Sequence, residues 1–488
     1  MTLYEDLKKQ LHEKGIDIIN EDYYEHINVW KSWEQGSVDN FHFYNIKIAD
    51  GTEVQCEKKT MNMAKKGAND MQKLLWSNKC VIKLATDEKT KKLWGILDSK
   101  QNNFTIMFPQ MIEFACALGT TAMTQYKDSL GRTRIEYIND PSIIVPYAYD
   151  NFNITGFIVF DQWQEQENKK TVYYTHLTYH EFKTEKDEND ELKQVYRKYN
   201  ELYKSKDKSQ LGKEIDFSIK FPNVEELVEY DTDTPHFQII KPPLANNIDM
   251  NSPMGISIFA NSIDKLKAID NKYDSFDMEF VDGKRRILVD KTALKSTPQV
   301  ESDGSISQQI FFDRNDRTYV AMNGMKDQPV KDISFDLRYK EHIEAINSEL
   351  NWYSGDLGFG EDWYKFDGSG RATATEIISQ NDDAFRTKQT YEVVIKDVII
   401  DLVKAVCYLE GIEIEENEIQ IDFDNSRFEN QTATQQRLER EVNMGITGKV
   451  EYRMKVYNEE EEVAKQKVAE AEQQNSNVDD LLGTRGEK

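Results

Sequence analysis

The stretch of sequence that decides the fold begins with SPMGISIFANSIDKLKAIDNKYDSFDMEFVD, residues 252–282, and continues to Gly411. Ser252 and Pro253 are typical of a helix start, because a cap residue precedes a proline at the first helical position. Apolar residues then recur every three or four positions, which predicts one helix over Ser252–Asp282. They are Phe259, Ile263, Leu266, Ile269, Tyr273, Phe276 and Phe280.

The rest of the stretch predicts a β insert and two more helices. Lys284–Pro329 is rich in strand formers and turn residues. A second helix over Lys331–Ser354 carries one apolar face, and the chain then breaks over the Gly/Asp/aromatic loop Gly355–Arg371. A third, long helix follows and ends near Gly411. This order suggests an element shared by many subunits around an axis rather than a pocket within one subunit.

The remaining sequence predicts helices, then strands, then helices again. The helical segments before residue 120 include Phe108–Gly119, with a glycine cap, and a segment whose Trp30 and Trp33 are either core residues or docking residues. Strand and turn patterns run from Thr121 to about Phe237, and charged residues 183–213 predict a protruding hairpin. A short strand near residues 419–423, a helix from Thr432, a helix over about Lys449–Gln474 and a disordered tail complete the chain. The predicted fold class is therefore α+β.

Size and composition set outer limits on function. The chain has 488 residues, enough for more than one core, and a net charge of -25. We do not expect so acidic a protein to grip nucleic acid over its whole outer surface. Its four cysteines form no CxxC pair, which predicts neither a disulfide framework nor a metal site. Without a signal core or a long apolar run, we expect a soluble, intracellularly made protein with no membrane segment.

The sequence offers little enzyme chemistry. It contains no GxxxxGK[ST], HExxH or GxSxG motif. His176 and His180 have a zinc-like spacing, but the surrounding residues predict a strand. The glycines at 355, 358 and 360 lack a preceding strand and lie among acidic residues that would repel phosphate. The carboxylates of Glu376, Asp382 and Asp383 are interpreted as solvated helix charges rather than magnesium ligands. We expect no catalytic residue, cofactor or metal.

Three runs of residues resemble bacteriophage portal proteins of the SPP1-like family. Met254–Phe276 is similar to the family's stem-entering helix, and Ala372–Thr387 is similar to the start of its long helix. Tyr23–Gly36 is similar to the opening helices. The runs occur in the family's order and span nearly the whole chain.

The resemblance implies a portal fold with named parts. Portals form rings, usually of twelve subunits, at one vertex of the capsid, and are made in the cytoplasm of the host bacterium before they enter the virion. The parts implied for this chain are a wing (1–250), a stem helix (251–282), a clip (283–330), a second stem helix (331–354), a tunnel loop (355–371), a long wing helix and strand (372–425) and a crown with the C-terminal tail (426–488).

The resemblance also implies partners and candidate site residues. Double-stranded DNA would pass through the ring, the terminase large subunit and a head-completion or adaptor protein would dock at the clip, and the major capsid and scaffolding proteins would surround the ring. In the tunnel loop, Lys365 and Arg371 face DNA or are simply solvated. The aromatic residues Phe359, Trp363, Tyr364 and Phe366 pack the loop against a neighbour. In the clip, Lys284, Arg285 and Arg286 face the channel, anchor a partner or form structural salt bridges.

Carboxylates outnumber cations in the tunnel loop, because Asp356, Glu361, Asp362 and Asp367 stand against two basic residues. We therefore expect the loop to guide DNA loosely rather than hold it. The alternative function is a non-viral oligomeric scaffold or binding module with the same order of elements. A nuclease or phosphatase is a more distant third.

Overall fold

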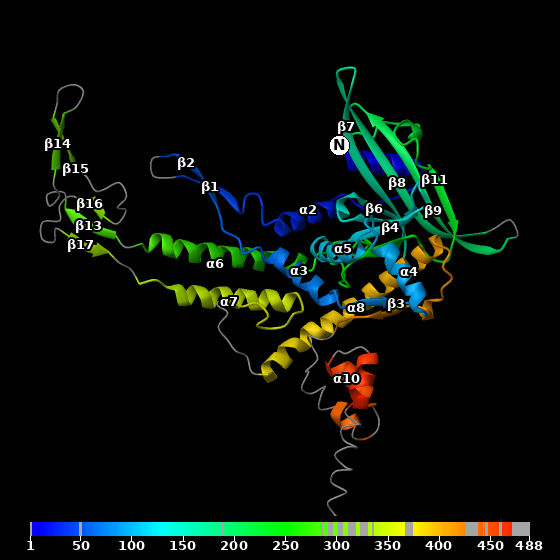
Figure 1. Cartoon of the computed structure of the whole chain (residues 1–488). Coiled ribbons are helices and arrows are strands. Elements are labelled where there is room, and N and C mark those ends of the chain that lie inside the picture. Colours follow the sequence, from blue (N-terminus) through cyan, green and yellow to red (C-terminus); the bar gives the residue numbers. More distant parts are fainter. Residues whose placement is uncertain are drawn as a thin grey trace, which may run out of the picture. The chain divides into compact units, whose positions relative to one another are not determined.

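Figure 1 shows the computed structural model of the chain. The structure divides into two compact units, Met1–Arg371 with Asp382–Phe423, and Ala372–Asn381 with Asp424–Lys488. The residues described are 2–47, 51–186, 190–284, 286–290, 296–300, 306–310, 319–322, 330–333, 336–366, 374–424, 438–442, 444, 448–457 and 461–470.

The helices before residue 120 form a core around α5, against which α2 and α3 pack. Trp30 and Trp33 of α2 are almost completely buried, which confirms that they are core aromatics. Helix α5 ends at Gly119, whose φ of 89° is a backbone conformation that favours glycine, as the predicted cap requires. The helices are α1 (Leu3–Glu13), α2 (Asp22–Glu34), α3 (Met63–Leu75), α4 (Asp87–Leu97) and α5 (Phe104–Leu118), and the short strands among them are β1 (Phe43–Lys47), β2 (Glu53–Glu57) and β3 (Val81–Lys83).

A six-stranded antiparallel sheet dominates the middle of the chain, in the order β10-β9-β8-β7-β6, with β11 also paired to β9. Long strands form because β-branched and aromatic residues such as Val172 and Tyr174 bury one side of the sheet. β8 and β9 form the predicted protruding hairpin, whose tip, 187–189, lies outside the described residues. The strands are β6 (Ile144–Asp150), β7 (Asn153–Glu167), β8 (Lys170–Lys186), β9 (Leu192–Ser205), β10 (Lys213–Ile215) and β11 (Leu227–Asp231), and a second sheet has the order β12-β4-β5, with β4 (Thr121–Lys127), β5 (Thr133–Ile138) and β12 (Phe237–Ile240).

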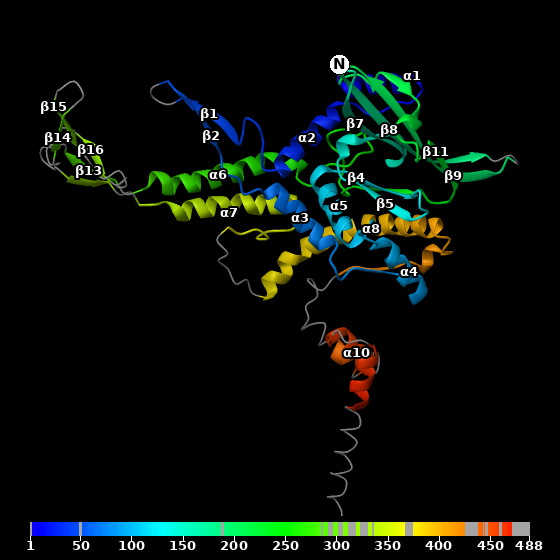
Figure 2. The ribbon, with the colours of Figure 1, turned by 45° about the horizontal axis from the view of Figure 1, so that its top comes forward.

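Helices α6 (Ile263–Asp282) and α7 (Tyr339–Asp356) lie side by side, as Figures 1 and 2 both show. Three ion pairs fix their antiparallel register. Lys265 pairs with Asp356, Lys272 with Glu349 at 2.6 Å, and Arg338 with Glu279 at 2.8 Å. Hydrogen bonds from Arg338 lower the pKa of Glu279 to about 2, so this carboxylate remains ionised over the physiological range.

The prediction that the first of these helices begins at Ser252 is wrong. Residues 252–259 are not helical and are all buried, whereas an amphipathic helix would expose one face. This run packs closely on the end of α5, because the N–H of Gly255 donates to Thr120 Oγ1 at 2.9 Å and the N–H of Ile258 donates to the C=O of Cys116. Tyr23 donates a further hydrogen bond to the C=O of Gly255. Backbone groups satisfied by neighbouring elements leave no reason for a helix before Ile263.

The β insert between α6 and α7 is confirmed as strand-rich, but it extends beyond Pro329. β17 pairs antiparallel with β13, and β16 pairs parallel with β13. The second helix therefore begins at Tyr339 rather than at Lys331, because residues 330–333 are committed to the sheet. The strands are β13 (Arg286–Asp290), β14 (Ser296–Val300), β15 (Ile306–Ile310), β16 (Tyr319–Met322) and β17 (Val330–Ile333).

The long third helix is confirmed as α8 (Ala374–Leu409), which spans 36 residues and buries most of the apolar side chains of its second half. The short strand β18 (Gln420–Asp422) is also confirmed and pairs with β3. The predicted helix start at Thr432 lies outside the described residues, although 438–442 are helical. The final helix is present as α10 (Lys449–Tyr457) and as helical residues 461–470, and the predicted tail lies outside the described residues.

Candidate functional site

Residues 357–366 of the predicted loop Gly355–Arg371 fold back along α7 instead of leaving it, whereas residues 355 and 356 are the end of α7 itself. Three polar side chains of α7 hold the backbone of this segment. Ser354 Oγ donates to the C=O of Gly360 at 2.6 Å, and Oδ1 of Asn351 accepts from the N–H of Asp362 at 2.8 Å. Asn347 Oδ1 accepts from the N–H of Phe366 at 2.8 Å. Because residues 347, 351 and 354 are spaced by one helical turn, they present a single row of partners to the segment.

The aromatic side chains of this segment pack within their own chain. Phe359 is fully buried and stacks on Trp363 with ring centroids 4.8 Å apart. Tyr364 is buried beside Tyr353 of α7, with a centroid distance of 6.3 Å, and Phe366 lies 5.3 Å from Phe276 of α6. The rings thus contact α6, α7 and one another within the chain. Their packing against a neighbouring subunit stays a prediction.

A second attachment joins the segment to α8. Thr387 Oγ1 donates to the C=O of Gly358 at 2.8 Å. Gly358 has a φ of 77°, and a Cβ at this position would lie 2.5 Å from Thr387 Oγ1. Glycine is therefore required here both by the backbone conformation and by the close approach of Thr387. The segment 357–366 is fixed to α7 on one side and to α8 on the other.

The charged residues proposed for the loop have different environments. Asp356 is the last residue of α7 and accepts hydrogen bonds from Lys265 and from Ser262 Oγ, so it joins α7 to the start of α6. Asp362 lies 3.5 Å from Lys365 as an ion pair and also bonds Asn351. Glu361 is exposed. Arg371 and Asp367 lie outside the described residues, as does the rest of 367–373.

The three basic residues proposed for the insert are described only in part. Lys284 is exposed and follows the turn at Gly283 that ends α6. Arg286 opens β13 opposite Ile333 of β17, and Arg285 lies outside the described residues. A role for these three residues toward the channel or a partner therefore stays a prediction.

The histidines with zinc-like spacing have structural partners. Both lie on β8, as the sequence predicts. His176 bonds Asn200 Oδ1 at 3.0 Å, whereas His180 is buried, bonds Tyr196 at 2.8 Å and stacks on Phe157. Burial lowers the pKa of both imidazoles, so both are neutral at pH 7. Within the described residues, no three His, Cys, Asp or Glu side chains are grouped so that they could hold a metal ion.

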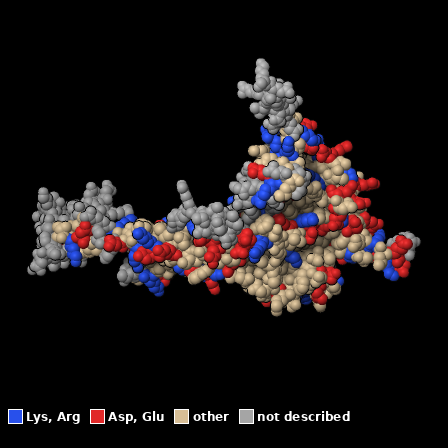
Figure 3. All heavy atoms as spheres, turned by 90° about the horizontal axis from the view of Figure 1, so that it is seen from below, with Lys and Arg blue, Asp and Glu red and all other residues tan. Residues whose placement is uncertain are grey.

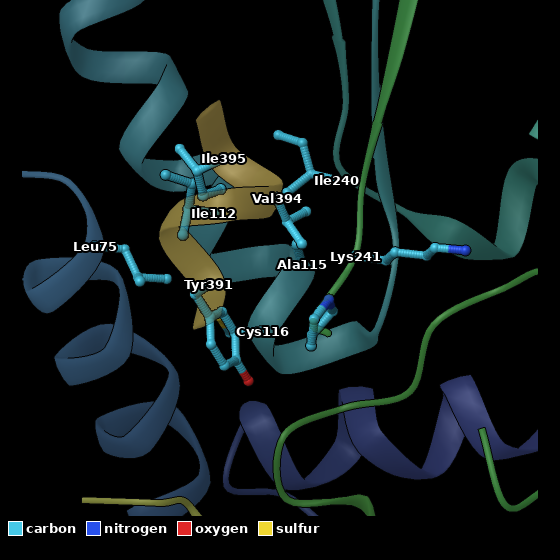
Figure 4. Close-up of a pocket in the computed structure, with 10 residues that line it drawn as sticks. Leu75, Ile112, Ala115, Cys116, Ile240, Lys241, Tyr391, Val394 and Ile395 are labelled. Carbon is cyan, nitrogen blue, oxygen red and sulfur yellow. The ribbon is translucent and has the colours of Figure 1, made fainter. Parts of the chain in front are cut away.

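A small apolar cavity between α5, α8 and β12 is shown in Figure 4. Its volume is about 10 Å³, which holds at most one water molecule, so it is a gap in the packing and not a ligand site. The side chain of Lys241 points away from the cavity in Figure 4 and donates to the C=O groups of Phe152 and Pro253 at 2.8 and 2.9 Å. In the described part of the chain, no helix is long and apolar enough to cross a membrane.

One buried polar cluster was missed by the sequence analysis. Asp270 of α6 is buried and accepts from His42 Nε2 at 3.0 Å, from Thr60 Oγ1 at 2.8 Å and from the N–H of Met61 at 2.9 Å. His42 Nδ1 in turn accepts from the N–H of Val38 at 2.9 Å, which assigns the proton of the imidazole to Nε2. The cluster attaches both ends of the segment containing the β1–β2 hairpin to α6. The sequence carries no signal for it, because 228 positions separate His42 from Asp270.

Comparison with known proteins gives one family. The family described as phage portal protein, SPP1 Gp6-like, matches residues 17–477 of the 488. No match is found among curated proteins. The family match covers α2–α5, the two largest sheets of the middle of the chain, the α6–α7 pair with its insert, and α8. The chain therefore belongs to the SPP1 Gp6-like family of phage portal proteins.

Proposed function

We propose that this portal protein forms a closed ring, most simply of twelve subunits, through which double-stranded DNA enters and leaves the capsid. The observation that carries the proposal is the antiparallel α6–α7 pair with a β insert between its helices, within a chain that the portal family matches over 17–477. This match favours a portal over the alternative of a non-viral scaffold. A ring requires two complementary faces on every subunit, and exposed apolar side chains such as Trp352 of α7 and Val393 of α8 are available for subunit contacts.

The parts of the subunit follow from this proposal. Helices α6 and α7 form the stem, and β13–β17 form the clip, where the terminase large subunit and the head-completion or adaptor protein dock. The elements before α6 form the wing, together with most of α8, and the residues after β18 form the crown. The chain acts as a conduit and a docking platform rather than as an enzyme, and the major capsid and scaffolding proteins surround the wing in the virion.

We further propose that the DNA-facing part of the tunnel loop is shorter than the predicted range Gly355–Arg371. Because 357–366 pack on α6, α7 and α8, we place the contact with DNA at residues 367–373, together with the exposed Glu361 and the partly exposed side chain of Lys365. Arg371 is then the cation nearest to the DNA. Asp356 and Asp362 act inside the subunit through their hydrogen bonds and ion pairs. Because the loop offers few basic side chains to DNA, it makes few contacts with phosphates. DNA therefore slides through with little friction.

Electron microscopy of the purified protein tests the ring. We expect rings with a central channel wide enough for B-form DNA. A protein that remains monomeric at high concentration, or that cleaves DNA when a divalent metal is added, contradicts the proposal.

Deleting residues 367–371 tests the loop. We expect rings that assemble normally but do not support DNA packaging, because the deletion leaves 357–366 and its attachments to α7 and α8 intact. Substituting Glu361 with Gln provides a control that changes one exposed charge without shortening the loop. Loss of the ring itself in the deletion variant contradicts the assignment of these residues to the channel.

A further inference from the structure

One end of the six-stranded sheet carries a cluster of exposed lysines, which we call the lysine end. The turn between β7 and β8, the end of β9 and the start of β10 all lie at this end of the sheet, because β7 pairs with β8 up to Glu167↔Lys170 and β10 pairs with β9 at Lys213↔Lys204. The structure gives none of its five lysines an ion pair within the described residues. They are Lys169, Lys170, Lys206, Lys208 and Lys213.

The carboxylates near the lysine end are already engaged. Glu167 pairs with Lys204 and Glu165 pairs with Lys220, each at 2.6 Å. Asp207 accepts from the N–H and Oγ of Ser209 at 2.9 and 2.8 Å. Asp6 accepts from the N–H of Leu211 at 2.8 Å and from Gln10. The lysine end therefore has a local excess of positive charge in a chain whose net charge is -25.

The opposite end of β9 adjoins a surface of opposite charge, which we call the acidic face. Asp231 of β11 pairs with Val195 of β9, and its C=O accepts from Tyr408 at the end of α8 at 2.9 Å. Around this junction, acidic residues from the segment after β11, from α8 and from the segment after α8 gather. They are Asp233, Asp401, Glu413, Glu415 and Glu416.

Cations neutralise the acidic face only in part. Lys404 lies 3.9 Å from Asp233 and 3.7 Å from Glu416, and these two carboxylates remain 78% and 67% exposed. Lys89 bonds the backbone C=O of Glu413 at 2.7 Å and pairs with Glu418, and Lys193 pairs with Asp231. Figure 3 shows acidic side chains spread along the large body of the molecule, consistent with this excess.

A single strand fixes the separation of the two surfaces. Val195 lies beside the acidic face and Lys204 beside the lysine end, so the surfaces are nine residues apart along β9. At about 3.3 Å per residue, this corresponds to about 30 Å. Two different surfaces of opposite charge at opposite ends of one rigid strand are suited to a head-to-tail contact, in which each copy offers one surface to each neighbour.

We propose that the lysine end of one subunit contacts the acidic face of the next subunit in the ring. The inference rests on the proposed ring and names the surfaces that join its subunits. Five lysines match five carboxylates, and the complementary surface is present on every copy of the chain. Exposed charge pairs act mainly on the rate and salt dependence of association, so the contact selects and orients neighbours while apolar contacts elsewhere supply most of the affinity.

Charge reversal tests the proposal in the full-length chain. One variant carries Lys206→Glu with Lys208→Glu, a second carries Glu415→Lys with Glu416→Lys, and a third combines all four changes. Lys100→Glu with Lys340→Glu is the matched control, because both lysines are exposed, neither belongs to either surface, and the change in net charge is the same. The fraction of rings is measured by sedimentation velocity between about 50 and 500 mM NaCl, where screening of exposed charges changes most.

We expect each two-site reversal to reduce the ring fraction at 50 mM NaCl roughly tenfold, and the four-site variant to restore it, because its two surfaces are complementary again. The control should assemble like the parent. Normal assembly of the lysine variant overturns the proposal, and so does equal loss in the control. If the lysine variant forms rings but loses binding to a short DNA duplex, the surface binds phosphate instead. Absence of rings from the unmodified chain at every salt concentration contradicts the proposed function itself.

Discussion

At the scale of single residues, Gly358 is the position most sensitive to a small change. Its φ of 77° and the nearby Thr387 Oγ1 exclude a side chain. We expect Gly358→Ala to lower the free energy of unfolding by about 1–3 kcal/mol, because the new Cβ is strained and displaces Thr387. Gly355→Ala is the control, since no atom lies within 4 Å of a Cβ there and alanine favours the helix. Chemical denaturation measures both, and an equal effect of the two substitutions would disprove the role of Thr387.

Asp401 gives a prediction about pH. Burial is the main cause that raises its pKa from 3.8 to about 6, and the nearby carboxylates add to this effect, whereas the charge of Lys404 opposes it. A carboxyl whose pKa is higher in the folded state binds more protons there, so its charge destabilises the fold above about pH 6 and has no effect below about pH 4. We expect Asp401→Asn to be more stable than the parent at pH 7.5, by on the order of 1–2 kcal/mol, with the difference vanishing near pH 4. Thermal unfolding of the variant and the parent is measured across this pH range at equal oligomeric state. A stability difference that grows as the pH falls would refute the prediction.

Single residues also mark where sequence reasoning ends. The loop aromatics Tyr364 and Phe366 were recognised as packing residues, but their partners on α7 and α6 were not. The ion pair between Asp356 and Lys265 was likewise invisible, because it joins residues 91 positions apart. Composition and motif reveal what a side chain is able to do, whereas the partner that engages it depends on the tertiary fold. The roles of Lys365 and Arg371 toward DNA remain predictions for the same reason.

At the scale of elements, periodicity predicted α7, α8 and the strands of the large sheet well, because each has one buried face. It failed at Ser252–Phe259, where apolar residues with helical spacing are buried on all sides and the backbone bonds α5. It also failed at β17, which is short and gains its strand form from pairing with β13. In both cases a neighbouring element, and not the local pattern, determines the conformation.

The attachment of the β1–β2 hairpin to α6 gives a prediction at this scale. Isolated two-stranded hairpins are marginally stable, and this one pairs with no other strand in the described part of the chain. Asp270 holds the chain on both sides of the hairpin. We expect Asp270→Ala to lower the free energy of unfolding by about 2–4 kcal/mol, because three buried donors lose their acceptor. We also expect it to increase proteolytic cleavage in residues 38–62.

Asp264→Ala provides the matched control for that experiment. Asp264 lies on the same helix, but its side chain is 96% exposed and pairs only loosely with Lys267. Its removal should cost less than about 0.5 kcal/mol. If a protease cleaves residues 38–62 equally slowly in the Asp270 variant and in the parent, the hairpin is held by other contacts.

At the scale of the whole molecule, the two compact units are unequal. The first unit contains both sheets and ends at Phe423, and the second contains residues 372–381 and everything from Asp424 onward. The sequence predicted a boundary close to this point, between the strand near 420 and the helix that follows. The basis of that prediction is that the apolar, strand-forming residues end there and a polar segment begins. The assignment of the following residues to a crown stays a prediction.

Two truncations test this boundary. A chain ending at Asp424 keeps β18, which pairs with β3, and keeps Phe423, whose ring centroid lies 6.1 Å from that of Trp76. We expect its first unit to unfold at nearly the same temperature as in the full chain. A chain ending at Glu418 lacks β18, the partner strand of β3, and lacks the contact of Phe423. Its free energy of unfolding should fall by about 2 kcal/mol or more, because Ile82 and Trp76 become exposed. Calorimetry at matched oligomeric state distinguishes the two. If both truncations melt alike, β18 does not close the first unit; if the longer one already melts early, residues after 424 stabilise it.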